Sequence, residues 1–310
     1  MRQTLVRSVA IVLMALIFPV TAAWAAAVTP LVDAAWVKRN AGQPGVVVLD
    51  IRNGGTKDSE QTYRAGHIPG AVYSDYGSAG WRTTRDGVPG MLPPPEALEK
   101  LIGGLGIDND THVVIVTAGA SAGDMGSATR VYWTFKVLGH DKVSILDGGY
   151  RAYVADPSDP VETGAVQPTP KTFKANLRPE MIADYRDVLA AQKKGEALLD
   201  LRSPAQYLGK AKSGAAKRAG TIPTAVNVPG TEITGKDGRF VSAQRVGALL
   251  KAVGVGSDED AIAFCNTGHW ASLGWFAKSE ILGQKNVKLY DGSMADWSAR
   301  PELPVEVKAQ

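Results

Sequence analysis

Residues 66–72 read GHIPGAV and residues 220–226 read GTIPTAV, so one seven-residue pattern occurs twice in the chain. Two further segments recur around it: DIR at 50–52 and DLR at 200–202, and LDGG at 146–149 and YDGS at 290–293. The partners lie 144 to 154 residues apart. Solenoid repeats have periods of roughly 20–50 residues, so this spacing indicates a duplicated domain.

Short apolar runs alternate with helical patterns in both halves of the chain. The runs are Val46–Leu49, Val113–Val116, Leu198–Leu199 and Ala261–Phe264, and the helical stretches include Pro94–Leu105, Met125–Leu138 and Val241–Val253. Unbroken aliphatic runs are typical of strands that are buried on both faces of a parallel sheet. We therefore predict an α/β fold with two tandem domains, each a parallel sheet flanked by helices.

The N-terminus has the features of an export signal. Arg2 and Arg7 precede an apolar run from Val9 to Val20, which is too short to span a bilayer, and Ala23-Trp24-Ala25 offers a cleavage site. We expect residues 1–25 to be a signal peptide, with a retained anchor as the alternative, and the mature protein to be periplasmic or secreted. The expected parts of the mature chain are an N-terminal domain at 28–155, a proline-rich linker at 156–177 and a C-terminal domain at 178–310.

The amino-acid composition argues against a disordered, collagen-like or coiled-coil protein. The chain has 310 residues, of which 45% are hydrophobic and 21% charged, as in ordinary globular proteins. Without residues 1–25 it has 32 Lys and Arg against 31 Asp and Glu, a net charge of +1. This balance gives no reason to expect nucleic acid or a membrane as a partner after signal cleavage. A single cysteine excludes an intrachain disulfide.

The lone cysteine, Cys265, opens a short loop between a strand and a helix. The loop reads CNTGHW (265–270), and apolar residues then recur at helical spacing from Ala271 to Leu282, with Gly283 as the stop. The first turn of a helix has free N–H groups and a positive dipole end. A thiol beside the N-terminus of a helix therefore has a pKa below its usual value of about 8.5. We predict that amides of the loop hold the Cys265 thiolate, and equally a persulfide.

Together the repeated segments and the cysteine loop resemble the tandem-domain rhodaneses, a family of sulfurtransferases. Met91-Leu92-Pro93 also resembles a motif of that family, and the resemblance covers about residues 30–300. It implies two rhodanese-like domains with the catalytic loop in the C-terminal copy. It also implies transfer of sulfane sulfur from a small donor such as thiosulfate, through a Cys265 persulfide, to a thiophilic acceptor such as cyanide or a thiol. No metal or organic cofactor is expected.

Within the loop, we expect Asn266, Thr267, Gly268, His269 and Trp270 to bind the substrate. Family members that are specific for thiosulfate commonly place Arg and Lys directly after the cysteine, and mercaptopyruvate-type members place Gly and Ser there, whereas this chain has Asn266 and Thr267, so mercaptopyruvate or another sulfur donor is an alternative. Family members also carry an anion-binding Arg where this chain has Gln206. Because these cations are missing, weak affinity for thiosulfate is predicted. A protonated His269 would replace part of the charge. Four residues of a nearby insertion are candidates for the pocket rim, or else form a solvated loop: Lys210, Lys212, Lys217 and Arg218.

Two other functions match parts of this sequence pattern. An exported persulfide carrier, loaded by a partner protein, would use the same cysteine without catalysing turnover. The loop GASAG at 119–123 matches the nucleophile elbow of serine hydrolases, with Ser121 as nucleophile. The repeat instead explains it as a degenerate copy of the cysteine loop, and no Asp/Glu and His follow at suitable positions.

The cysteine loop does not fit a cysteine phosphatase, and it would make only a weak metal site. A cysteine phosphatase needs an Arg six positions after the cysteine, where this chain has Ala271. Cys265 and His269 would give a Cu(I) ion only two ligands. We expect His67 to be a structural hydrogen-bonding residue, and the Asp-x-Arg segments to form buried ion pairs at the strand ends.

Overall fold

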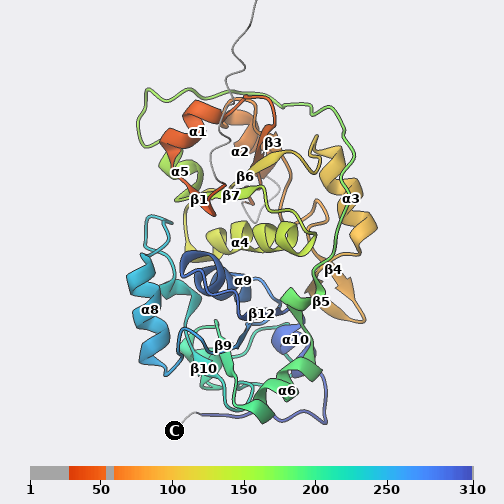
Figure 1. Cartoon of the computed structure of the whole chain (residues 1–310), viewed down its shortest axis with the longest axis vertical. Helices are drawn as coiled ribbons and strands as arrows, with labels where there is room; N and C mark the ends of the chain where they lie inside the picture. Colours follow the sequence, from red (N-terminus) through yellow and green to blue (C-terminus); the bar gives the residue numbers. More distant parts are fainter. Residues whose placement is uncertain (1–27, 54–58, 309–310) are drawn as a thin grey trace, which may run out of the picture.

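The computed structural model describes residues 28–53 and 59–308. Each half of the chain forms a five-stranded parallel sheet flanked by helices, which confirms the predicted α/β fold with two similar domains. The domains are stacked along the long axis of the molecule, with the N-terminal domain uppermost in Figure 1. The proposed signal peptide, residues 1–25, lies outside the described residues.

The two sheets have matching strand orders. The N-terminal order is β1-β7-β6-β2-β3, and the C-terminal order is β10-β9-β11-β12-β8, with every pairing parallel. The first sheet consists of β1 (Leu31–Val32), β2 (Val46–Asp50), β3 (Val72–Tyr73), β6 (His112–Val116) and β7 (Val143–Leu146). The second consists of β8 (Ile182–Ala183), β9 (Ala197–Asp200), β10 (Val226–Asn227), β11 (Ala261–Phe264) and β12 (Val287–Tyr290). A separate antiparallel hairpin pairs β4 (Thr83–Arg85) with β5 (Val88–Met91).

Helices cover both faces of each sheet. Those of the N-terminal domain are α1 (Ala34–Asn40), α2 (Ser59–Ala65), α3 (Pro95–Gly104), α4 (Ala122–Val137) and α5 (Gly149–Tyr153). Those of the C-terminal domain are α6 (Tyr185–Lys194), α7 (Pro204–Tyr207), α8 (Ala243–Ala252), α9 (Ala271–Phe276) and α10 (Ser293–Trp297). Short 3₁₀ turns lie at Pro179–Met181 and Gly230–Glu232. The helix predicted after the cysteine loop is α9, but its last part, Ala277–Ile281, is a π-helical turn, which the sequence pattern did not predict.

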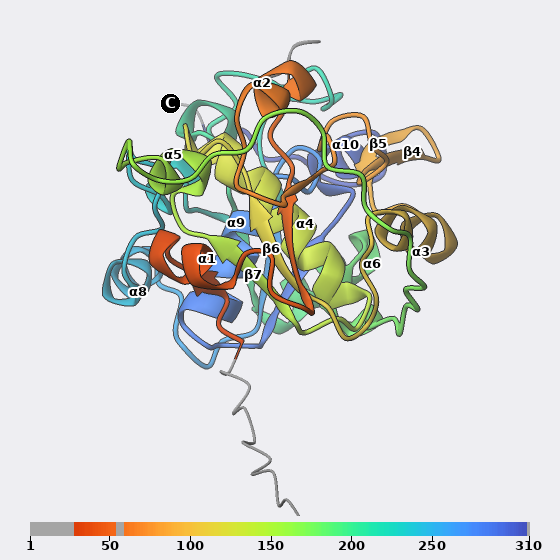
Figure 2. The same cartoon turned by 90° about the horizontal axis from the view of Figure 1, so that it is seen from above.

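Side chains of successive strand residues enter different cores, because they point to opposite faces of a sheet. Val48 and Val114 pack with α1 and α5 on the outer face of the first sheet, whereas Leu49 and Ile115 belong to a core that continues into the C-terminal domain. Helices α4 and α9 lie against each other at the centre of this shared core (Figures 1 and 2). The two domains therefore share one apolar interior.

The Asp-x-Arg segments form the expected buried ion pairs. Arg202 pairs with Asp200 at 2.6 Å and also donates to the Gly220 carbonyl at 2.9 Å. Arg52 repeats this arrangement with Asp50 and the Gly66 carbonyl, at 2.8 Å each. Each arginine thus ties the end of an inner strand, β2 or β9, to the start of the repeated GxIPxAV segment.

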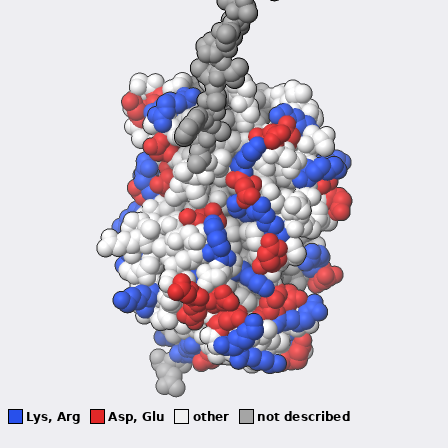
Figure 3. Space-filling view, viewed as in Figure 1, with Lys and Arg blue, Asp and Glu red and all other residues white. Residues whose placement is uncertain are grey.

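Basic and acidic side chains are interspersed over the face of the molecule drawn in Figure 3. Among the described residues, no helix has both the length and the apolar character needed to cross a bilayer.

Candidate active site

Cys265 directly follows β11, the central strand of the second sheet, and lies at the carboxyl edge where open parallel sheets bind ligands. It lines an open cleft of about 600 Å³ between the two domains. Only 2% of the residue's surface is exposed, so the thiol lies at the floor of the cleft. The other lining residues are Asn53, Tyr76, Arg82, Ser121, Gly123, Asp124, Ser127, Ser213, Asn266, Thr267, His269 and Trp270.

Four of the five expected binding residues therefore share the cleft with Cys265. The exception is Gly268, which has a φ of +73° and packs so closely on Arg130 and Asp291 that a β-carbon would overlap both. Gly268 is needed for the turn of the loop, since this conformation favours glycine.

Ser293 holds the two ends of the loop together. Its hydroxyl accepts hydrogen bonds from the amides of Cys265 at 3.0 Å and Gly268 at 3.1 Å, and donates to the Tyr290 carbonyl at 2.8 Å. The residue is fully buried and has a φ of +48°, a strained conformation for a residue with a side chain. Three hydrogen bonds thus hold a strained residue directly beneath the cysteine.

The remaining amides of the loop are unoccupied. Within the described part of the chain, the N–H groups of Asn266, Thr267, His269 and Trp270 have no acceptor. The Gly268 amide is committed to Ser293 and does not belong to this group. These four amides are the donors available to an anionic sulfur, and their role in holding it stays a prediction.

His269 is fixed by the N-terminal domain. The Tyr76 hydroxyl lies 2.7 Å from Nδ1, and the Gly123 carbonyl lies 2.8 Å from Nε2. Because a carbonyl only accepts, Nε2 carries the proton and Nδ1 accepts from Tyr76. Burial lowers the His269 pKa to about 4, and the nearby cations Arg82 and Arg130 add to this effect. His269 is therefore neutral at neutral pH and does not replace the missing positive charge, which it would do only when protonated.

The cation in the cleft is Arg82, which sequence reasoning missed. It precedes the β4–β5 hairpin of the N-terminal domain, and its Nη2 donates to the Thr267 carbonyl at 2.7 Å and hydroxyl at 2.9 Å. Nothing in the local sequence marks Arg82, because only the packing of the two domains brings it beside the loop.

Arg130 is the second arginine near the loop, but its charge is neutralised. It pairs with Asp291 at 2.6 Å in the interior between the domains. Asp291 also accepts from the Leu92 amide at 2.7 Å, so the Met91-Leu92-Pro93 segment contacts the C-terminal domain at this point. This arrangement supports the Cys265 loop from behind.

The candidate rim residues do not line the cleft. Lys212 donates to carbonyls of its own loop, Ser213 and Ala216, and Arg218 donates to carbonyls at 297, 298 and 300. Lys210 and Lys217 are exposed elsewhere. The solvated-loop alternative therefore holds, and only Ser213 of this insertion reaches the cleft. Gln206, at the position of the missing arginine, accepts from the Asn266 side chain at 3.0 Å.

Trp270 combines the two roles that the sequence suggested. It lines the cleft, and its ring also packs so closely on Gly230 that a β-carbon there would overlap it. The aromatic ring is thus both a wall of the cleft and part of the packing beneath α9.

In the N-terminal domain, the loop equivalent to the Cys265 loop binds the carboxylate of Asp124. Thr117 occupies the position of Cys265, since its carbonyl accepts from the Tyr150 amide as that of Cys265 accepts from the Met294 amide. The Asp124 carboxylate accepts from the amides of Gly119 and Ala120. Ser121, the candidate hydrolase nucleophile, accepts from the Asp124 amide as the N-cap of α4. These contacts support the interpretation of this loop as a degenerate copy.

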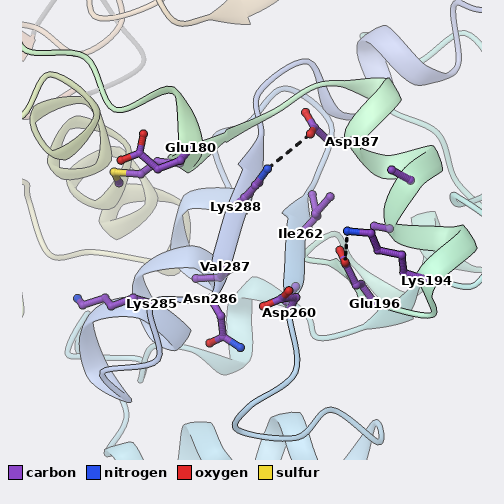
Figure 4. Close-up of a pocket in the computed structure, with 14 residues that line it drawn as sticks. Glu180, Asp187, Lys194, Glu196, Asp260, Ile262, Lys285, Asn286, Val287 and Lys288 are labelled. Carbon is purple, nitrogen blue, oxygen red and sulfur yellow. Dashed lines mark hydrogen bonds and ion pairs between the residues drawn. The ribbon is translucent and has the colours of Figure 1, made fainter.

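A second pocket, of about 280 Å³, lies away from Cys265 at the opposite end of the strands β11 and β12 (Figure 4). Its charged side chains largely neutralise one another: Lys288 contacts Asp187 at 3.5 Å, and Lys194 contacts Glu196 at 3.1 Å. No nucleophile lines it. The interdomain cleft is therefore the candidate active site.

Known proteins share both the sequence and the fold. The model of the rhodanese-like domain matches twice, at residues 33–156 and 184–300. A 3-mercaptopyruvate sulfurtransferase of Escherichia coli (strain K12) is 34% identical, over 90% of this chain and 98% of that protein. A putative thiosulfate sulfurtransferase of Saccharopolyspora erythraea is 32% identical, over 89% of this chain and 95% of that protein.

Solved structures agree. The crystal structure of a 3-mercaptopyruvate sulfotransferase from Escherichia coli matches with a TM-score of 0.75 and 33% identity, covering 86% of this chain and 98% of that one. An anaerobic ergothioneine biosynthesis enzyme from Chlorobium limicola matches with a TM-score of 0.76 at 22% identity, over 91% of this chain and 71% of that one, which shows a shared fold. The duplicated domain, the cysteine loop and these matches lead to one conclusion: the chain belongs to the rhodanese family, with two rhodanese-like domains in tandem.

Proposed function

We propose that this protein is a sulfurtransferase that carries sulfane sulfur on Cys265, from a small donor to a thiophilic acceptor. The observation that supports this most is the position of Cys265. It is the single cysteine of the chain and lies at the floor of an open cleft, on a loop where four neighbouring amides have no acceptor among the described residues.

The reaction has two covalent steps. The Cys265 thiolate attacks the outer sulfur of a donor such as thiosulfate, a bond to the sulfane sulfur forms, and sulfite leaves with the electron pair of the broken S–S bond. Cyanide or a thiol then attacks the terminal sulfur of the persulfide and releases the thiolate. Such a scheme gives ping-pong kinetics. Amides of Asn266, Thr267, His269 and Trp270 stabilise the anionic sulfur in both steps.

Steady-state formation of thiocyanate by the purified mature protein tests this proposal. We expect Cys265→Ser to abolish turnover, because no other residue of the chain carries a thiol. We expect Ser121→Ala to retain it, because the Ser121 hydroxyl caps α4. Turnover that survives Cys265→Ser would refute the assignment.

A non-catalytic persulfide carrier is the second candidate. It is favoured by the scarcity of cations in the cleft, where Arg82 is the single Lys or Arg among the lining residues described. Turnover with donor and cyanide alone supports the enzyme. A persulfide that forms only when a partner protein is added supports the carrier.

Export from the cytoplasm, to the periplasm or beyond, is also part of the proposal. The apolar run between Val9 and Val20 and the cleavage pattern Ala23-Trp24-Ala25 support it. N-terminal sequencing of the protein from fractionated cells tests it: a start near residue 26 is expected, and an uncleaved cytoplasmic chain would contradict it.

A further inference from the structure

Arg82 is a cation without an anionic partner. Its Nε donates to the Gly90 carbonyl at 3.2 Å, and its Nη2 donates to the carbonyl and hydroxyl of Thr267. All of these acceptors are neutral, and among the described residues no carboxylate lies within 4.0 Å of the guanidinium. The positive charge is therefore not neutralised, although Arg82 is half-buried beside the nucleophile's loop.

The β4–β5 hairpin has a glycine, Gly90, where the Arg82 side chain passes. Gly90 has a φ of +81°, and a β-carbon there would overlap the Arg82 guanidinium. Arg82 donates hydrogen bonds to Thr267, which is two positions after Cys265. All three residues line the same cleft. Arg82 is thus held rigidly at the site of sulfur transfer.

The other charges near the cleft leave Arg82 as its one free cation among the described residues. Arg130 is paired with Asp291 behind the loop, and His269 is neutral at neutral pH. Asp124 is the one carboxylate among the described residues that line the cleft. With the Cys265 thiolate present, the described residues give the cleft two negative charges and one positive charge, which disfavours a donor that brings two more negative charges.

We infer that Arg82 binds the anionic group of the sulfur donor, and that the cleft therefore prefers a donor with one negative charge, such as an alkanethiosulfonate, to a dianion such as thiosulfate. This inference rests on the proposed function. For an alkanethiosulfonate, the thiolate attacks the terminal sulfur, the S–S bond breaks, and a sulfinate leaves with the electron pair. The two negative charges of the reactants end on the persulfide and the sulfinate, so charge balances.

Donor kinetics with cyanide as the acceptor test the choice of donor. We expect a lower KM for methanethiosulfonate than for thiosulfate in the wild type. Arg82→Gln raises the KM for methanethiosulfonate by roughly tenfold to a hundredfold, as expected for a lost hydrogen bond to a charged group, with a smaller change in kcat. Arg85→Gln is the matched control, because Arg85 is exposed in the same hairpin and does not line the cleft. A lower KM for thiosulfate, or equal effects of the two substitutions, would overturn the inference.

Alkylation of Cys265 separates an electrostatic role of Arg82 from a structural one. Iodoacetate is an anion and iodoacetamide is neutral, and both react with the single thiol of the chain. We expect Arg82→Gln to lower the iodoacetate-to-iodoacetamide rate ratio roughly tenfold, and Arg82→Lys to retain most of it. An unchanged ratio in Arg82→Gln overturns the inference, because a merely structural arginine alters both rates together. This readout needs no sulfur transfer. It is therefore independent of the result that would refute the proposed function, which is turnover that survives Cys265→Ser.

Discussion

A serine takes the place of a glycine directly beneath the nucleophile. In the N-terminal domain the equivalent residue is Gly149, with a φ of +59°, where a β-carbon would overlap the backbone of Thr117 and Gly119. Ser293 keeps nearly the same backbone conformation, and its hydroxyl binds the Cys265 and Gly268 amides. The sequence showed the repeat at this position, but a serine in place of a glycine gave no sign that it shapes the loop.

Replacing Ser293 should therefore destabilise the protein, and Ser293→Ala should destabilise it more than Ser293→Gly. Ser293→Ala keeps the strained φ and leaves two buried amides without acceptors, which should lower the free energy of unfolding by roughly 3 kcal/mol. Ser293→Gly also loses the hydroxyl but relieves strain of about 1–2 kcal/mol, so it should be the more stable variant. Urea denaturation measures both. Equal or reversed stabilities would contradict the account of Ser293.

His269 should make stability depend on pH. Its folded-state pKa is about 4, below the ordinary value of 6.5, so the unfolded chain binds the proton first as the pH falls. Stability due to this residue is complete above about pH 6.5 and is lost as the pH falls towards about 4, by up to about 3 kcal/mol.

Denaturation of the wild type and His269→Gln between pH 4 and pH 7 checks this prediction. The variant cannot take up this proton, so its stability should fall less steeply with decreasing pH. Parallel curves for the two proteins would show that His269 does not titrate as its burial requires.

At the scale of secondary-structure elements, the two strand–loop–helix units differ in what occupies their amides. The C-terminal loop leaves amides free beside Cys265, whereas the N-terminal loop binds its own Asp124 carboxylate, whose pKa is raised by burial despite these hydrogen bonds. The unbroken apolar runs predicted both central strands, because a strand that is buried on both faces of a parallel sheet consists almost entirely of apolar residues. The sequence could not show that a side chain of α4 folds back into its own loop, nor that α9 ends in a π-helical turn.

A cysteine placed in the N-terminal loop should therefore not restore activity. In a Cys265→Ser background, Thr117→Cys puts a thiol at the equivalent position, but Asp124 occupies the nearby amides and repels a thiolate. We expect no thiocyanate formation. Turnover at a level comparable to the wild type would show that the free amides of the C-terminal loop are not what activates Cys265.

At the scale of the whole molecule, the active site is assembled from both domains. Tyr76 and Gly123 form hydrogen bonds with His269, and Arg82 forms one with Thr267. These partners are about 150 to 190 residues apart in the sequence. The motifs predicted the nucleophile and its loop because those residues are contiguous. They could not predict Arg82 or Tyr76, because nothing in the sequence shows which surfaces of two similar domains meet.

The Arg130–Asp291 ion pair should be a major stabilising contact between the domains. Both side chains are buried, so Arg130→Met leaves the Asp291 charge without its partner. Loss of one partner of a buried pair costs about 3–5 kcal/mol. Equilibrium unfolding measures this loss, and Arg245→Met, which breaks the exposed pair with Glu232, is the control with an expected loss below about 1 kcal/mol. Similar losses in both variants would contradict the importance assigned to the interface.

Intact-protein mass spectrometry after exposure to a sulfur donor tests the central claim most directly. The account predicts that the mature protein gains the mass of one sulfur atom, that peptide mapping places it on Cys265, and that cyanide removes it with release of thiocyanate. A protein that gains no sulfur from any donor tried, or that keeps the sulfur when cyanide is added, would contradict the claim that Cys265 carries sulfur between two substrates.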